Sequence, residues 1–399
     1  MKSLLKRSLA GLLLLSPLGT GQADAQLIPM GPESVVVSGN ALGLECPQVI
    51  GHANRSFTVV WPQNPSPALV SIAGQRFDST GSPVGGPIDV DGGLSGRQVY
   101  ALATENRGAL GDIAVWSSYL PSSPETTWRF NARVLPGGDM FKVNAPSYVR
   151  QLFPRRVGGY VAAWPVTRGG GACSFALLDA AGHLAGPITR LSNVLPSAQC
   201  IQSAQALDGS FTVDWITMDA PSKVVLQRFG ANGKPLGPAV VAIPSGPSAV
   251  RLASAPDGRS ALTWVEYGAA EGGLTGTIRL RFFGVNGAPA SIPIAVDSPP
   301  EPPAEAFNPE ALAMDSSGRA LLLWQLLDAD SGGERYTLQL WTPGGPESSI
   351  RPLGANPVQT GIPFCASIAK AGQTWVVVWR AQRDNGDTAI FVRRFFTFG

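Results

Sequence analysis

Histidines and closely spaced cysteines, which often build catalytic or metal sites, are scarce in this 399-residue chain. The only histidines are His52 and His183, and no two of the four cysteines are close in sequence. Two distant imidazoles leave almost no material for a histidine metal site or a Ser-His-Asp triad. The sequence also lacks a phosphate-cradling glycine loop, a His-Glu-x-x-His motif and the Ser-x-Asp-x-Gly-x-Thr-Trp box of sialidases. We therefore expect no resident cofactor and no catalytic constellation of these kinds.

Long apolar runs are also scarce, and the one at the N-terminus reads as a signal peptide. Residues 1–25 begin with the basic residues Lys2, Lys6 and Arg7. The apolar run Leu9–Leu15 suits a signal peptide and is too short to span a bilayer. Ala23-Asp24-Ala25 is a small-x-small cleavage site, which predicts a mature chain of residues 26–399. We expect an exported protein, secreted, periplasmic or at the cell surface, with no membrane insertion.

Charge is low and balanced. Charged residues make up 15% of the chain, with 30 Lys+Arg and 28 Asp+Glu. Removing the signal peptide takes away three basic residues and one acidic residue, which leaves 27 of each sign. Nucleic acids and anionic membrane surfaces select a basic excess. The predicted partner is therefore an unidentified protein or glycan, and nucleic acid is excluded.

A short apolar run that ends in tryptophan occurs seven times. The end-tryptophans are Trp61, Trp116, Trp164, Trp215, Trp264, Trp324 and Trp379. They are spaced 55, 48, 51, 49, 60 and 55 residues apart. A repeat of this length indicates one supersecondary unit used many times.

The repeated unit reads as four short strands. The runs are about five to seven residues long, rich in Val, Phe, Thr and Trp, and bounded by Gly, Pro and Asn. Four strands in each of seven units predict an all-β fold, a seven-bladed β-propeller over residues 26–399. The tryptophans are expected to fill the space between blades, and stacking on sugars is the alternative.

The two ends of the chain are predicted to meet. The last unit stops at residues 395–399, where its fourth strand should begin. The segment Gly31–Val37 resembles the fourth strand of another unit, Gly86–Val90. We expect this N-terminal strand to complete the seventh blade and remove an exposed sheet edge.

Two segments carry the fullest form of the repeat. Gln75–Gly85 and Gln227–Gly237 follow the pattern Arg-Phe-Asp-x-x-Gly-x-Pro-x-Gly, with Gly230 in place of Asp in the second. With the tryptophan strands, this pattern resembles that of exported bacterial β-propeller repeat proteins. The resemblance covers nearly the whole mature chain and implies the fold, but it implies no particular activity.

The repeat register also suggests how the cysteines pair. Cys46 precedes Trp61 by 15 residues, and Cys365 precedes Trp379 by 14. Both should therefore lie on the innermost strand of the first and last blades, which are neighbours in a closed ring. We predict a Cys46–Cys365 disulfide, which leaves Cys173–Cys200 as a second pair. The alternative is four buried free thiols.

Two acidic features have weaker interpretations. Asp328, Asp330 and Glu334 are spaced as in the opening of a calcium loop, although further ligands are missing and a solvated loop is the simpler interpretation. Asp214 lies inside an apolar tryptophan strand, where it could face the channel or bond to neighbouring backbone.

The better candidate site is the face that carries the loops after the tryptophan strands and the loops between blades. Variable loops on a rigid ring commonly carry binding. The candidate binding residues there are Tyr119, Glu266, Tyr267, Phe307 and Tyr336. We expect a non-catalytic binding or scaffolding module. The alternatives are a carbohydrate-active enzyme or lyase that uses Glu266 and Asp330, or a sugar-binding lectin.

Overall fold

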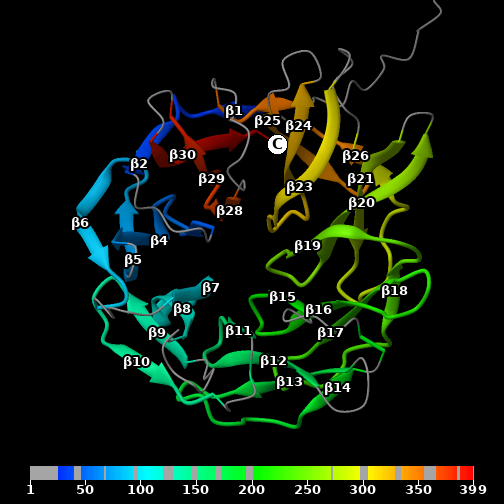
Figure 1. The fold of residues 1–399 in the computed structure, drawn as a ribbon, viewed down its shortest axis with the longest axis horizontal. Coiled ribbons are helices and arrows are strands. Elements are labelled where there is room, and N and C mark those ends of the chain that lie inside the picture. Colours follow the sequence, from blue (N-terminus) through cyan, green and yellow to red (C-terminus); the bar gives the residue numbers. More distant parts are fainter. Residues whose placement is uncertain are drawn as a thin grey trace, which may run out of the picture.

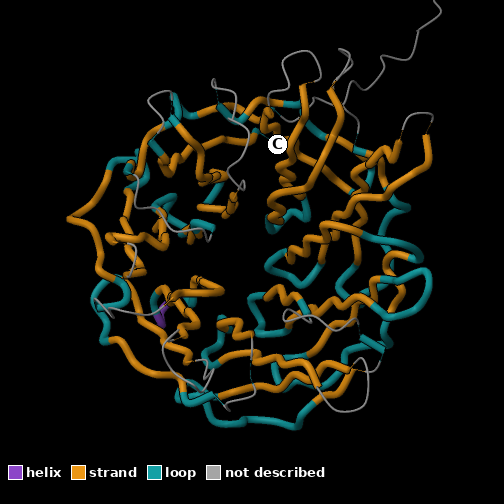
Figure 2. The backbone as a smooth tube through the Cα atoms, in the orientation of Figure 1, coloured by secondary structure: helices purple, strands orange, loops and turns teal. Residues whose placement is uncertain are grey.

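The chain folds into seven antiparallel sheets arranged in a ring around a central axis (Figure 1). The structure is a computed structural model. It describes residues 26–39, 46–66, 69–92, 98–119, 129–145, 149, 151–166, 172–191, 193–194, 201–270, 273–296, 304–328, 334–354, 365–383 and 387–398. The predicted all-β, seven-bladed β-propeller is confirmed. The tube drawing shows strands throughout the ring and one short helical turn, η1 (Gly108–Leu110) (Figure 2).

Each blade runs from an inner strand near the centre of the ring to an outer strand at the rim (Figure 1). Blade 1 contains β3 (Gln48–Gly51), β4 (Phe57–Ser66), β5 (Leu69–Phe77) and β6 (Pro83–Asp89). Blade 2 contains β7 (Gln98–Asn106), β8 (Asp112–Tyr119), β9 (Arg129–Leu135) and β10 (Met140–Val143). Blade 3 contains β11 (Gln151–Pro154), β12 (Tyr160–Val166), β13 (Ala172–Leu178) and β14 (Thr189–Leu191). Blade 4 contains β15 (Gln202–Gln205), β16 (Phe211–Ile216), β17 (Val224–Phe229) and β18 (Val240–Ile243).

The last three blades follow the same order. Blade 5 contains β19 (Ser248–Ser254), β20 (Ser260–Ala270), β21 (Gly273–Phe283) and β22 (Ile294–Ala295). Blade 6 contains β23 (Ala304–Met314), β24 (Ala320–Asp328), β25 (Glu334–Thr342), β26 (Gly345–Pro346) and β27 (Arg351–Pro352). Blade 7 contains β28 (Cys365–Ala371), β29 (Thr374–Gln382), β30 (Thr388–Thr397) and two N-terminal strands, β1 (Leu27–Pro29) and β2 (Ser34–Ser38). Blades 6 and 7 therefore have five strands, because the outer position is divided into two short strands in each.

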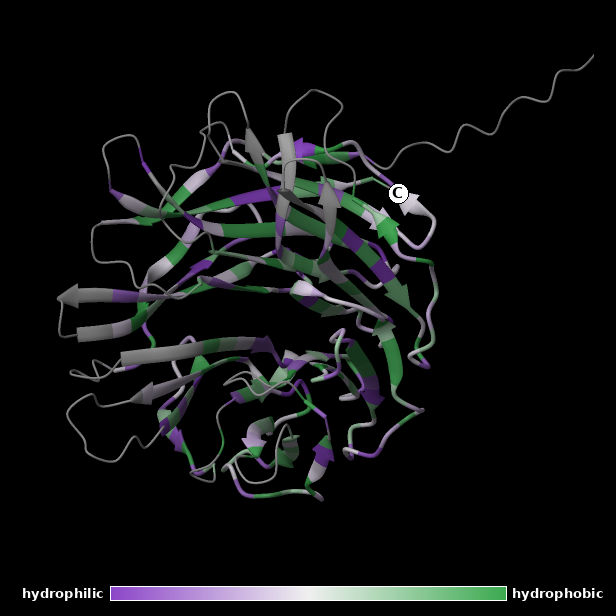
Figure 3. Ribbon diagram, turned by 45° about the vertical axis from the view of Figure 1, so that its right-hand side comes forward, coloured by the Kyte–Doolittle hydropathy of each residue, from purple (hydrophilic) through white to green (hydrophobic). Residues whose placement is uncertain are grey.

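The tryptophan strand is the second strand of every blade, and its indole packs toward the preceding blade. All seven end-tryptophans are buried, with exposures from 0 to 7%. Trp264, for example, shares a core cluster with Val224 and Leu226 of blade 4, and Trp61 shares one with Val376 of blade 7. Seven such clusters join successive blades, and hydrophobic residues run along the strands between them (Figure 3). The tryptophans belong to the core and are not available to stack on a sugar.

The ring is closed twice, on its outer edge by a strand and on its inner edge by a disulfide. The N-terminal strands β1 and β2 both pair with β30, which confirms that the N-terminus completes the last blade. The sequence predicts one strand over residues 31–37, whereas the pairing is interrupted at residues 31–33 and the extra strand β1 precedes the interruption. The Cys46–Cys365 disulfide is confirmed. Cys173 is disulfide-bonded as well, and Cys200, its predicted partner, lies outside the described residues.

The Arg-Phe part of the repeat has a structural explanation. Arg394 reaches from blade 7 to the turn of blade 1, where it donates to the carbonyl oxygens of Ser79 (2.8 Å) and Thr80. Gly81 of that turn has φ +87°, and a Cβ atom on it would lie 2.7 Å from the Arg394 guanidinium. Glycine is needed here both for its backbone conformation and for the approach of the arginine.

Within the residues that the structure describes, no helix has the length and apolar character needed to span a membrane.

Candidate binding face

Blades 5 and 6 carry longer hairpins than blade 4, as do blade 1, in which β4 and β5 have 10 and 9 residues, and blade 7, in which β29 and β30 have 9 and 10. β20 and β21 have 11 residues each, whereas β16 and β17 of blade 4 have 6 each. β23 and β24 have 11 and 9 residues. β20 begins after the turn that joins it to β19 and ends at the opposite face of the ring. The extra residues therefore extend the sheets toward the face where the sequence predicts binding.

Glu266 and Tyr267 lie on opposite sides of the β20–β21 hairpin. Glu266 is on the side of Trp264, which packs against blade 4, and it accepts a hydrogen bond from Arg279 Nε at 2.8 Å. Tyr267 is on the side of Val265, which packs against blade 6. The side chain of Tyr267 is 50% exposed, and its cross-strand partner is Gly276, which has no side chain to cover the ring. The hairpin thus presents an accessible aromatic ring on one side and an ion pair on the other.

The remaining predicted binding residues do not gather around Tyr267. Tyr336 is 5% exposed and packs in the core with Leu353 and Trp379, so its placement at the ligand face is corrected. It is buried because β25 begins at Glu334, which makes Tyr336 a strand residue facing blade 7. Tyr119 ends β8 and Phe307 lies in β23, and their side chains are outside the described part of the structure.

The calcium hypothesis remains a prediction. Asp328 ends β24 and Glu334 begins β25, so both lie at strand ends, and Asp330 lies outside the described residues. Elsewhere in the described chain, no three His, Cys, Asp or Glu side chains gather as they would around a metal ion.

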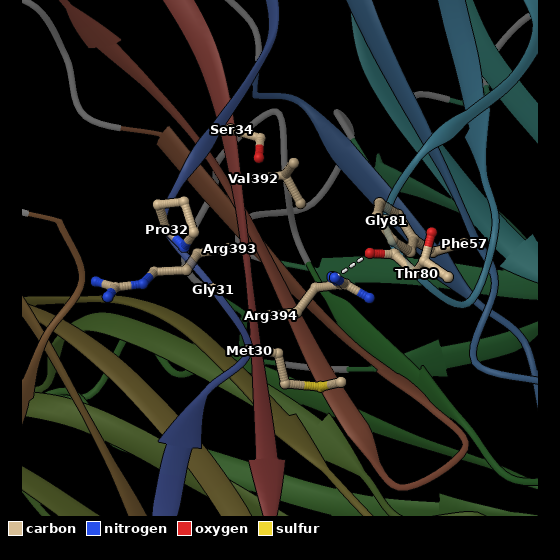
Figure 4. Close-up of a pocket in the computed structure, with 10 residues that line it drawn as sticks. All are labelled: Met30, Gly31, Pro32, Ser34, Phe57, Thr80, Gly81, Val392, Arg393 and Arg394. Carbon is tan, nitrogen blue, oxygen red and sulfur yellow. Dashed lines mark hydrogen bonds between the residues drawn. The ribbon is translucent and has the colours of Figure 1, made fainter.

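A small cavity at the ring closure was not predicted from the sequence. It has a volume of about 250 Å³ and lies where the outer strand of blade 7 is interrupted (Figure 4). Met30 and Pro32 line it from the N-terminal segment, Arg394 from β30, and Phe57 and Thr80 from blade 1. Arg394 points across it to the carbonyl oxygen of Thr80. Because this arginine already binds the neighbouring turn, we interpret the cavity as part of the closure.

Asp214 is the most strongly perturbed acid. Its side chain is 2% exposed on β16, opposite Gln202 of β15. Burial raises the pKa of Asp214 to about 7, and hydrogen bonds from its own backbone amide and from that of Gln202 oppose this rise. One oxygen, Oδ1, has no hydrogen-bond partner among the described residues. An acid in this position stays protonated up to nearly neutral pH, which fits a structural role in an apolar strand.

Replacing Asp214 with Asn is expected to stabilise the protein at alkaline pH. Since the folded pKa of about 7 is above the unfolded value of about 3.9, stability from this group is full below pH 4 and is lost as the pH rises through 7. At pH 8, Asp214→Asn should raise the free energy of unfolding by on the order of 2 kcal/mol. Denaturation of the wild type, Asp214→Asn and the exposed control Asp139→Asn at pH 4.5 and pH 8 measures this. Equal stability of Asp214→Asn and the wild type at pH 8 would contradict it.

No protein-family model and no curated protein matches the chain. Among solved structures, a protein of unknown function from Dyadobacter fermentans is similar over 94% of this chain and 99% of its own, with 10% identity and a TM-score of 0.49. The β-propeller domain of the Trilobed protease from Pyrococcus furiosus is similar over 89% of this chain and 94% of its own, with 9% identity and a TM-score of 0.49. An α-L-arabinofuranosidase from Fusarium graminearum is similar over 91% and 97%, with 11% identity and a TM-score of 0.44. Similarities at this level carry no inference about activity.

Proposed function

We propose that this chain is an exported bacterial β-propeller repeat protein that works as a binding or scaffolding module, without catalysis of its own. The partner is a protein or a glycan, and it binds the face built by the long hairpins of blades 5 and 6. The observation that carries this proposal is the β20–β21 hairpin, which extends past its core tryptophan and carries a half-exposed Tyr267. A rigid ring that projects such hairpins suits binding, because the binding groups are ordered before the partner arrives.

The chemistry of Tyr267 fits either kind of partner. A tyrosine ring has an apolar body and a polar hydroxyl, and tyrosine is enriched at protein interfaces. With Gly276 across the hairpin, no neighbouring side chain on that strand separates the ring from a ligand. The hairpin would therefore offer a flat contact surface with little conformational entropy left to lose.

Replacing Tyr267 with Ala is expected to weaken binding about tenfold or more, as for a central interface aromatic. The mature wild type, Tyr267→Ala and Leu207→Ala would be tested on a glycan array and against the secreted proteins of the source cells. Leu207 is a matched control because it is 61% exposed and lies in the β15–β16 turn on the opposite face. Binders lost with Tyr267→Ala and kept with Leu207→Ala support the proposal. Binding that is equal in all three proteins, or lost only with Leu207→Ala, contradicts it.

The second candidate is a carbohydrate-active enzyme or lyase that uses Glu266. Glu266 bonds to Arg279 and lies on the opposite side of the hairpin from Tyr267, which does not favour a shared pocket. Polysaccharide cleavage by the wild type that disappears in Glu266→Gln would favour this reading over the binding module. A lectin is less well supported, because the position two residues after each tryptophan differs from blade to blade.

A further inference from the structure

Each seam between neighbouring blades carries a polar contact near the tight-turn face. Six of these seams use arginine or lysine. Five of the contacts are Arg155 to the Ala231 carbonyl, Arg228 to the Val285 carbonyl, Arg259 to the Ser317 carbonyl, Lys370 to Asp315, and Arg394 to the Ser79 carbonyl. A sixth pairs Arg156 with Glu105 at 2.8 Å. The seam between blades 1 and 2 has an arginine contact as well, from Arg133 to the carbonyl oxygens of Asp89 and Val90, but it differs from the others in also having a histidine, His52, beside Asp112 of the next blade.

His52 is held from both sides by blade 2. Its Nε2 lies 3.3 Å from Asp112 Oδ2, and its Nδ1 lies 3.1 Å from Asn106 Nδ2. Thr58 of blade 1 donates to the same Asp112 oxygen at 3.2 Å. Since Asp112 at neutral pH only accepts, the imidazole proton belongs on Nε2.

Asn106 can act toward His52 only as a hydrogen-bond donor. Its Nδ2 also donates to the Gly51 carbonyl oxygen at 2.8 Å, and its Oδ1 accepts the Gly108 amide at 2.8 Å. These two bonds fix the orientation of the amide, so the nitrogen, and not the oxygen, faces His52. Nδ1 must therefore accept, and a proton on Nδ1 would place two donors against each other. Protonation of His52 would thus break the contact between Asn106 and His52, and it would push against the amide that also links blade 2 to Gly51 of blade 1.

The groups around His52 shift its pKa in both directions. Burial lowers the pKa of His52, Asp112 opposes this effect, and Arg76 of β5 adds to it. Glu105 of β7 is paired with Arg156 on the other side of its strand. Lys370 of β28, which packs against β3, donates to the Gln373 carbonyl and lies near Thr397 Oγ1.

We propose that the seam between blades 1 and 2 is an acid-sensitive joint, which is closed while His52 is neutral and loosens when Nδ1 is protonated. The joint would respond to the change from neutral to mildly acidic surroundings that an exported protein can meet. Its working range begins below about pH 6.5, where an unfolded histidine takes up its proton. Burial also raises the pKa of Asp112, and the neighbouring His52, Thr58 and Arg76 oppose this rise.

The first test follows the two histidines of the wild type by NMR, with His183→Gln used to assign them. His183 is a suitable reference because its side chain is 67% exposed and its ion-pair partner is Asp179, in its own blade. We expect His52 to show the Nε2–H tautomer at pH 7 and to titrate below about 6.5. The Nδ1–H tautomer, or a midpoint at or above 6.5, would overturn the proposal.

The second test asks whether the seam opens. The Gly108 amide, which Asn106 Oδ1 accepts, should exchange about tenfold faster at pH 5 than at pH 7.5 once the intrinsic pH dependence is removed. The Gly287 amide, in the turn of blade 5, should keep its protection at both values. In His52→Gln the acceleration at Gly108 should be absent, and in His183→Gln it should persist. An acceleration that persists in His52→Gln, or none in the wild type, would show that this histidine is not the sensor.

Discussion

Removing the Cys46–Cys365 disulfide is expected to lower the free energy of unfolding by on the order of 5 kcal/mol. The bond joins residues 319 positions apart, so it restricts nearly the whole unfolded chain. In the chain-entropy description a loop of 100 residues contributes about 4.7 kcal/mol, and longer loops contribute slightly more. The variant Cys46→Ala/Cys365→Ala avoids leaving a buried serine at residue 365, which is 6% exposed. Urea unfolding of this variant and of the wild type, both without reductant, measures the difference.

The pairing of the N-terminal strands with β30 is a second closure of the ring, which does not depend on the disulfide. β1 and β2 still pair with β30 in the variant, so the ring should remain folded although less stable. A variant with an unchanged urea midpoint would mean that the disulfide adds nothing to the outer strand pairing. A variant that cannot fold at all would mean that this outer strand does not close the ring alone.

Replacing Trp215 with Ala is expected to destabilise the protein by about 3–5 kcal/mol, the usual cost of removing a buried aromatic side chain. The indole is 7% exposed and packs with Phe175 and Cys173 of blade 3. The loss combines the apolar area removed from burial with the cavity left between two blades. Thermal unfolding followed by circular dichroism measures it.

Tyr267→Ala is the matched control for this substitution, because it removes an exposed aromatic from the tryptophan strand of the next blade. Its effect on stability should stay within about 0.5 kcal/mol. If Trp215→Ala unfolds at the wild-type temperature, the indole does not join blades 3 and 4.

The fold could be predicted because each blade must bury its own tryptophan. A sheet packed between two neighbours needs an apolar strand and a large side chain, and the same solution recurs about every fifty residues. The register of that repeat was enough to predict the Cys46–Cys365 disulfide between neighbouring blades, although Cys46 lies just before the inner strand β3 and only Cys365 lies on an inner strand. The fold and this disulfide could be predicted because both follow from a repeat that is visible in a single sequence.

The features that the sequence did not predict depend on where the strands begin and end. The spacing of 60 residues between Trp264 and Trp324 suggests long loops, whereas β20, β21 and β23 simply continue. Tyr336 is another such case, because β25 already begins at Glu334 and places this residue on a buried strand face. Strand β1 has only three residues, too few to give a recognisable period, and it exists because β30 offers it an edge.

The His52 seam could not be predicted, because its members come from different repeats that meet only in the folded ring. One signal was present in the sequence. Asp112 stands four residues before Trp116, where the first and fourth repeats have Phe57 and Phe211. A carboxyl in place of a core aromatic is an irregularity that needs a polar partner, and His52 provides it.

Peptide mass mapping of the mature protein without reduction tests the central claim most directly, which is that the first and last blades are neighbours in a closed ring. We expect one cross-linked species that joins the peptide containing Cys46 to the peptide containing Cys365 and that separates on reduction. A link from Cys46 to Cys173 or Cys200, or a free thiol at Cys46, would contradict it.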